Sequence, residues 1–189
     1  MLSHDALNVP PSRWIERFLP LIKRGGLVLD LAAGGGRHTR LLRDRGFRAV
    51  AADRDTASLA RGFAGAAATK IITIDLEDGG PWRLGGGFDG IVVTNYFYRP
   101  LFPALIEALA QGGAILYETF MTGNERYGKP SNPDFLLKPG ELAAAFGTAL
   151  TIIAFEQGNV DAPRPAAIQR IAAVKGPVGA LPQAEIQRG

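Results

Sequence analysis

Three consecutive glycines, Gly34 to Gly36, lie between an apolar run at residues 27–30 and a segment whose apolar residues have helical spacing. Glycine permits a tight turn and lets the backbone come close to a ligand. The apolar run predicts a buried strand, so the expected order is strand, glycine turn, helix. This order is typical of an α/β protein that binds a ligand beside its first strand.

Strand-like and helix-like segments alternate along most of the chain. Predicted strands cover residues 27–30, 47–53, 70–75, 90–95, 114–118, 151–155 and 168–174. Predicted helices cover residues 12–22 (capped by Ser12 and kinked or shortened by Pro20), 38–45, 56–63, 102–109 (ended by Gly112 and Gly113) and a segment that begins at Pro139. The alternation predicts an α/β, Rossmann-like fold: a parallel sheet with helices on both faces, whose ligands bind at the carboxyl ends of the strands.

Two connections depart from this pattern. Residues 77–88 are too short and too rich in glycine for a full crossover helix. Residues 119–138 have no periodicity but contain the apolar side chains Phe120, Met121, Tyr127 and Phe135. Because long irregular segments in small domains are often functional, we expect this one to form a lid over the site.

The composition limits the classes of protein. With 189 residues, 47% hydrophobic and 21% charged, we expect one domain over residues 1–175 and a flexible tail over 176–189. The chain has no cysteine, which excludes disulfides, thiolate zinc sites and cysteine nucleophiles, and no metal site is expected. No membrane span or signal peptide is visible, so we expect a cytoplasmic protein without membrane association.

Three ligands compete for the glycine turn. A nucleoside triphosphate loop is excluded because no glycine is followed by Lys and then Ser or Thr. The dinucleotide pattern G-x-G-x-x-G can begin at Gly34, but Thr39 stands in place of its third glycine. The third ligand is S-adenosylmethionine, which needs a slim turn and acceptors for its ammonium, ribose hydroxyls and adenine.

Acidic residues favour the third ligand. Asp30, Asp53 and Asp75 each end one of three consecutive predicted strands, which places all three at the ligand edge of the sheet. A carboxylate can accept hydrogen bonds from two ribose hydroxyls at once. A single aspartate of this kind is also a common helix cap or turn residue, so the prediction depends on the set. His38, in the first turn after the glycines, is expected to pack or cap.

Residues 30–36, Asp-Leu-Ala-Ala-Gly-Gly-Gly, resemble the first motif of the class I S-adenosylmethionine-dependent methyltransferases, with Ala32 in the place of the first glycine. The resemblance covers about residues 25–175 and implies a seven-stranded sheet with an antiparallel last strand. It also implies that Asp53 binds the ribose, that Arg54 flanks the adenine, and that Asp75 and the Leu76 amide bind the adenine edge. The implied cofactor-binding residues are Asp30, Ala32, Gly34, Gly36, Asp53, Arg54, Asp75, Leu76 and Asn95.

Three further stretches, residues 98–101, 117–120 and 139–142, resemble a compact bacterial branch that includes the tellurite-resistance methyltransferases. Members of that branch differ in methyl acceptor. Candidate acceptor-binding residues are Tyr96, Tyr98, Arg99 and Glu118. The tyrosines could also be core or rim aromatics, and Arg99 a surface charge. Asn95 lacks the two prolines that follow it in enzymes methylating nucleobase or glutamine amino groups, which argues against that chemistry.

The sequence therefore predicts a methyltransferase that transfers a methyl group from S-adenosylmethionine to a small acceptor, anionic or soft, by in-line displacement. This reaction does not always need a base, so no catalytic residue is assigned. Three alternatives stay open: an RNA methyltransferase, suggested by basic residues such as Arg37 and Arg40; a non-catalytic S-adenosylmethionine-binding regulatory module; and a nicotinamide oxidoreductase. The acceptor and the oligomeric state are left open.

Overall fold

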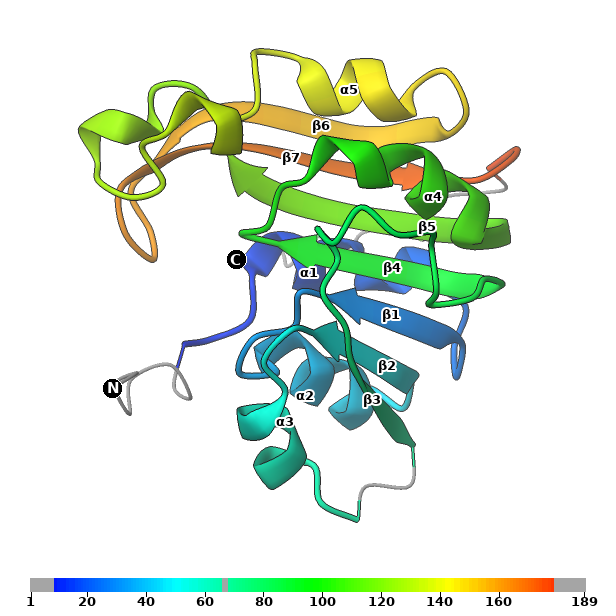
Figure 1. Ribbon diagram of the computed structural model, residues 1–189. Coiled ribbons are helices and arrows are strands. Elements are labelled where there is room, and N and C mark those ends of the chain that lie inside the picture. Colours follow the sequence, from blue (N-terminus) through cyan, green and yellow to red (C-terminus); the bar gives the residue numbers. More distant parts are fainter. Residues whose placement is uncertain (1–8, 66–67, 179–189) are drawn as a thin grey trace, which may run out of the picture.

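A computed structural model describes residues 9–65 and 68–178. Its seven strands form one sheet in the order β3-β2-β1-β4-β5-β7-β6, which runs from bottom to top in Figure 1. The strands are β1 (Leu27–Leu31), β2 (Arg48–Asp53), β3 (Thr69–Thr73), β4 (Phe88–Thr94), β5 (Leu109–Phe120), β6 (Thr151–Val160) and β7 (Ala166–Val174). The first five strands are parallel, and β7 is antiparallel to both β5 and β6. The predicted Rossmann-like sheet with an antiparallel last strand is confirmed.

Helices cover both faces of the sheet (Figure 1). They are α1 (Arg13–Phe18), α2 (Arg37–Asp44), α3 (Ala57–Gly62), α4 (Phe102–Ala108) and α5 (Glu141–Phe146). The first two pack Trp14, Ile15 and Leu42 on one face, whereas α4 and α5 pack Leu105 and Phe146 on the other. Each such buried side chain contributes about 1.5–3 kcal/mol.

Both ends of α1 follow the sequence prediction. The Ser12 hydroxyl accepts hydrogen bonds from the amides of Trp14 and Ile15, at 3.1 and 3.5 Å, as an N-cap. At Pro20 the α-helix gives way to a 3₁₀ turn, Leu19–Leu21, because proline cannot donate the next helical hydrogen bond.

Several predicted boundaries are wrong. The helix before β5 ends at Ala108, so Gly112 and Gly113 belong to the strand and do not terminate a helix. The pairing of β4 with β5 shifts register here, and a Cβ at Gly113 would lie 2.6 Å from the Phe88 carbonyl oxygen. The last helix begins at Glu141 rather than Pro139, and β6 continues to Val160. Strand β3 ends at Thr73, two residues before Asp75.

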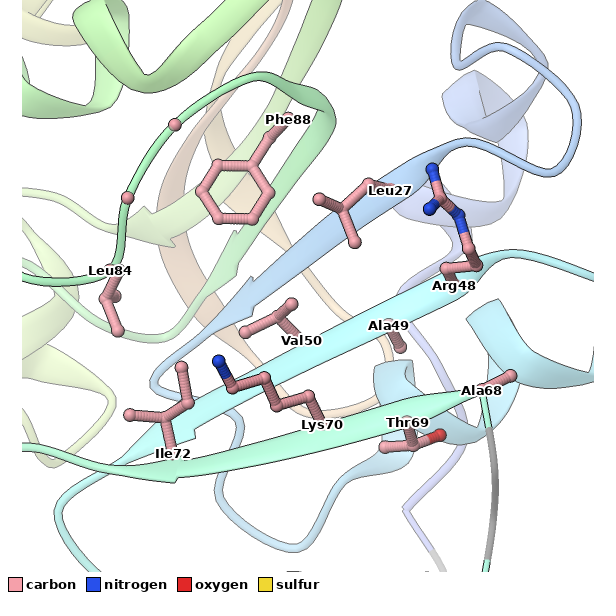
Figure 2. Close-up of a pocket in the computed structure, with 12 residues that line it drawn as sticks. Leu27, Arg48, Ala49, Val50, Ala68, Thr69, Lys70, Ile72, Leu84 and Phe88 are labelled. Carbon is pink, nitrogen blue, oxygen red and sulfur yellow. The ribbon is translucent and has the colours of Figure 1, made fainter.

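No helix connects β3 to β4. This agrees with the prediction that the segment of residues 77–88 is too short and too rich in glycine for a crossover helix. The absence leaves a groove of about 380 Å³ over the amino ends of β1, β2 and β3, on the face that α4 and α5 cover elsewhere. Figure 2 shows the apolar side chains of Leu27, Val50, Ile72 and Phe88 around it, with Lys70 beside them. The groove lies at the amino ends of these strands, whereas the candidate site described below lies at their carboxyl ends.

Within residues 9–65 and 68–178, no helix has the length and apolarity that crossing a membrane requires. The expected flexible tail lies, from residue 179 onward, outside the described residues.

Candidate cofactor and acceptor site

A cavity of about 290 Å³ opens at the carboxyl ends of β1, β2 and β3. This volume is near the lower end of the range for small-molecule sites. Five of the predicted cofactor-binding residues line it: Ala32, Asp53, Arg54, Asp75 and Leu76. Tyr96, predicted to bind the acceptor, lines it as well. The rest of the lining is Ile74, Glu77 and Phe135.

The glycine turn is fixed to the next strand by a side chain. The Gly34 amide donates a hydrogen bond to the Asp53 carboxylate at 2.8 Å. Gly34 has a φ of 54°, and a Cβ there would meet no protein atom within 4 Å. The turn therefore presents open backbone beside the cavity, as close approach of a ligand requires.

Gly36 has a different role. A Cβ at this position would lie 2.7 Å from the side chains of both Leu59 and Phe63. Gly36 is buried, so its lack of a side chain lets α3 and the residue after it pack against the turn. Gly36 thus supports the site through packing, and Gly34 is the exposed member of the pair.

Two non-glycine residues adopt the left-handed conformation in the described part of the chain, and both lie at this edge. Ala32 has a φ of 53° and Asn95 a φ of 55°. This conformation costs a side chain roughly 1–2 kcal/mol, which explains why glycine suits the place that Ala32 occupies. Asn95 directly follows β4, and its amide donates to the Glu118 carbonyl oxygen at 2.9 Å. Such outliers cluster at functional sites.

Asp30 does not join Asp53 and Asp75 in the cavity. It lies inside β1, one residue before the end, and is 2% exposed. Its carboxylate accepts a hydrogen bond from the buried Thr39 hydroxyl at 2.5 Å. Burial raises the pKa of Asp30 to about 6. Thr39, in place of the third dinucleotide glycine, thus joins α2 to β1 through its side chain.

Tyr96 brings a buried hydroxyl to the cavity. Among the described residues, this oxygen has no hydrogen-bond partner, although its atom is buried. Burial raises the pKa of Tyr96 above its ordinary value, and the nearby Glu77 carboxylate adds to the shift. The Tyr96 hydroxyl therefore faces both the cavity and the Glu77 carboxylate. Tyr98 is half-buried and does not line the cavity.

The segment from Met121 to Lys138 folds back over this edge, at the upper left of Figure 1. The predicted segment began at Thr119, but β5 continues to Phe120, so the irregular segment begins after it. Met121 and Leu137 form an isolated β-bridge that joins its two ends. Leu136 and Leu137 are buried, whereas Phe135 is 51% exposed and lines the cavity. The segment therefore contributes one aromatic side chain to the cavity wall, and its apolar ends are buried.

Arg99 holds this segment in place. Its guanidinium pairs with Glu141 at 2.6 Å and donates to the carbonyl oxygens of Asp134 and Leu136. It also lies over the Phe97 ring, 4.3 Å from the centroid. The charge of Arg99, an acceptor candidate from the sequence, is thus already paired with a carboxylate.

Glu118 lies in a polar network beyond Asn95. Its carboxylate accepts from the Ser12 hydroxyl at 2.9 Å and from Arg170 at 3.4 Å. His38 accepts a hydrogen bond from the Ser12 amide at 3.0 Å and is 2% exposed. Burial, together with the neighbouring Arg37, lowers the pKa of His38 to about 3, so the ring is neutral at pH 7. His38 packs and caps, as expected.

Three carboxyl groups and one guanidinium line the cavity: Asp53, Asp75, Glu77 and Arg54. This excess of negative charge suits a cationic ligand and opposes a pyrophosphate. No group of three potential metal-ligating side chains occurs among the described residues. The sequence did not indicate Glu77 as a site residue, and it indicated Phe135 only as part of the segment expected to form a lid over the site. The only sequence signal for Glu77 is its position two residues after Asp75.

No protein-family model matches the sequence, and no curated protein is similar to it. Solved structures do share the fold. TehB from Haemophilus influenzae aligns with a TM-score of 0.66 and 17% identity, over 80% of this chain and 58% of that one. A TehB-like SAM-dependent methyltransferase from Corynebacterium glutamicum aligns with a TM-score of 0.64 and 16% identity, over 90% and 91%.

The third comparison is a 1,6-didemethyltoxoflavin-N1-methyltransferase from Burkholderia thailandensis, solved with 1,6-didemethyltoxoflavin and S-adenosylhomocysteine bound. It aligns with a TM-score of 0.59 and 18% identity, over 80% of this chain and 72% of that one. With TehB, this chain spans less than two thirds of the matched protein. The strand order, the antiparallel β7 and these alignments agree: the chain has the Rossmann-like fold of the class I S-adenosylmethionine-dependent methyltransferases.

Proposed function

We propose that the protein is an S-adenosylmethionine-dependent methyltransferase whose acceptor is a small molecule. The observation that carries the proposal is the cavity beside the Gly34 turn, where Asp53 and Asp75 lie together at the ends of adjacent strands. Its excess of carboxylates suits the cationic S-adenosylmethionine better than NAD, whose pyrophosphate is anionic.

The residues of the cavity fit the parts of such a cofactor. Asp53 uses one carboxylate oxygen for the Gly34 amide and the other for the Asp55 amide, and each oxygen retains a lone pair for a ribose hydroxyl. Arg54, Asp75 and Leu76 lie along the β2 and β3 side, where they would contact the adenine. When bound, S-adenosylmethionine supplies a methyl group that is already activated by the sulfonium.

The residues of this chain then have two tasks, to align the acceptor and to exclude water. Tyr96 offers a buried hydroxyl that can donate to an acceptor atom, and Phe135 adds an aromatic side chain to the cavity wall. A small acceptor is supported by the N1-methyltransferase of similar fold, which was solved with a small heterocycle. The TehB-like alignments are compatible with the same class.

Two measurements test the proposal. Calorimetry should detect binding of S-adenosylhomocysteine and none of NAD; the opposite result would overturn the proposed cofactor. The protein is next incubated with methyl-deuterated S-adenosylmethionine and a cell extract divided into small molecules and RNA. We expect label in the small-molecule fraction, and label in RNA alone would reject a small acceptor. Binding without any transfer would indicate a regulatory module.

A further inference from the structure

Arg37 is a half-buried guanidinium at the same edge of the sheet as the cavity, and within residues 9–65 and 68–178 no carboxylate forms an ion pair with it. It is the first residue of α2, three positions after Gly34. Among the described residues it forms two hydrogen bonds, to the Pro10 carbonyl oxygen at 3.3 Å and to the Thr94 hydroxyl at 3.5 Å. Both are at the long limit for N–H···O bonds, and a guanidinium has five donors.

Two other arginines near this edge, Arg99 and Arg170, have carboxylate partners, whereas Arg54 lines the cavity itself. Arg99 pairs with Glu141, and Arg170 pairs with both Glu118 and Glu156. Glu118 is near enough to Arg37 to favour its charge, but the two form no ion pair. Burial lowers the pKa of Arg37, and the Glu118 and Asp30 carboxylates oppose this shift. An anion at this position would replace the hydration that burial removes.

The sheet order places Arg37 at one end of an extended site. Asp75 follows β3, Asp53 ends β2, Ala32 follows β1 and Thr94 ends β4, so these residues succeed one another along the carboxyl edge. Leu31 is paired with Val93, which makes Ala32 and Thr94 neighbours. A ligand that fills the cavity and continues past Ala32 therefore reaches the Arg37–Thr94 contact.

We infer that Arg37 binds a carboxylate of the bound ligand at this position, through the paired N–H groups of its guanidinium. The inference rests on the proposed function. Two sources offer this chemistry: the amino-acid end of the cofactor and a carboxylate on the methyl acceptor.

The test uses Arg37→Gln, with Arg43→Gln as the matched control, because Arg43 pairs with Asp44 at the surface of the same helix. Two probes are titrated by calorimetry: S-adenosylhomocysteine and 5′-methylthioadenosine, which lacks the amino-acid end. If the cofactor supplies the carboxylate, Arg37→Gln weakens S-adenosylhomocysteine binding about tenfold to a hundredfold and leaves 5′-methylthioadenosine unchanged.

If the acceptor supplies the carboxylate, both affinities persist and deuterium transfer into the anionic small-molecule fraction falls. Equal weakening of both probes would mean that Arg37 only supports the turn, and would overturn the inference. So would unchanged binding and transfer. Binding of neither probe by the unmodified protein would reject the proposed function itself. Arg37→Lys keeps the charge without the paired donors, and we expect an intermediate loss.

Discussion

The Asp53 carboxylate accepts the amide hydrogen of Gly34 at 2.8 Å, so the end of β2 fixes the turn that follows β1. The same carboxylate accepts the Asp55 amide at 2.9 Å, which fixes its orientation. One side chain therefore shapes the turn and lines the cavity at once.

Asp53→Ala should weaken S-adenosylhomocysteine binding by about 1–3 kcal/mol, the range for hydrogen bonds to a charged group. Asp53→Asn retains an oxygen for Gly34 and should lose less. Calorimetry measures both, with Asp44→Asn as the control, because Asp44 pairs with Arg43 at the surface. An affinity unchanged in Asp53→Ala would place the ribose elsewhere.

Asp30 should make stability fall as the pH rises. Its pKa is raised from 3.8 to about 6 by burial, so the folded protein binds this proton more tightly than the unfolded chain. The stability from this group is fully present well below pH 3.8 and is lost as the pH rises through about 6, with a total of about 3 kcal/mol. Asp30→Asn removes the effect and can still accept from Thr39.

Urea denaturation at pH 4 and pH 7 measures this difference. Relative to the unmodified protein, Asp30→Asn should gain about 2–3 kcal/mol between the two pH values. The lowered pKa of His38 has the opposite effect, because its stability contribution is lost as the pH falls below 6.5, but it is common to both proteins and cancels. A difference independent of pH would contradict the assignment.

Ala32→Gly should be nearly neutral or stabilising, within about 1 kcal/mol. The substitution relieves the left-handed conformation of Ala32, and this gain offsets the larger backbone entropy of glycine in the unfolded chain. Ala33→Gly is the control: Ala33 is buried and has no positive φ, so it should lose about 1 kcal/mol. Thermal denaturation compares the pair, and equal losses would argue against strain at Ala32.

Arg99→Met should loosen residues 121–138. The substitution removes the ion pair with Glu141 and the bonds to two backbone carbonyl oxygens of the segment. We expect amide exchange there to accelerate about tenfold to a hundredfold, while exchange in β1 and β4 stays slow. Arg17→Met, which removes an exposed pair with Glu156, is the control. Unchanged exchange would mean that the apolar ends of the segment suffice to hold it.

The order of the elements followed from local signals: Ser12 caps α1, Pro20 ends it, and β1 is a short apolar run. The antiparallel last strand followed from the resemblance of residues 30–36 to the methyltransferase motif. Gly112 and Gly113 were misassigned because a helix stop and a strand irregularity look alike in sequence. The deciding contact, between Gly113 and the Phe88 carbonyl, joins segments 25 positions apart.

The sequence predicted those site residues that lie at the end of a strand or directly after it. Asp53, Arg54, Asp75 and Leu76 meet at the cavity because parallel strands bring their carboxyl ends to one edge. Asp30 lies inside β1, one residue before the strand ends, so its side chain contacts Thr39 and does not line the cavity. The partner of Arg99 is 42 positions away, so no local pattern could show that its charge is engaged.

The lack of a helix between β3 and β4 has a mechanical consequence. Strand β3 has a neighbour on one side only, and the groove leaves part of one face uncovered. A strand with few apolar contacts and exposed backbone hydrogen bonds has low local stability. Asp75, Leu76 and Glu77 follow β3, so an adenosyl group bound to them would also stabilise this edge strand.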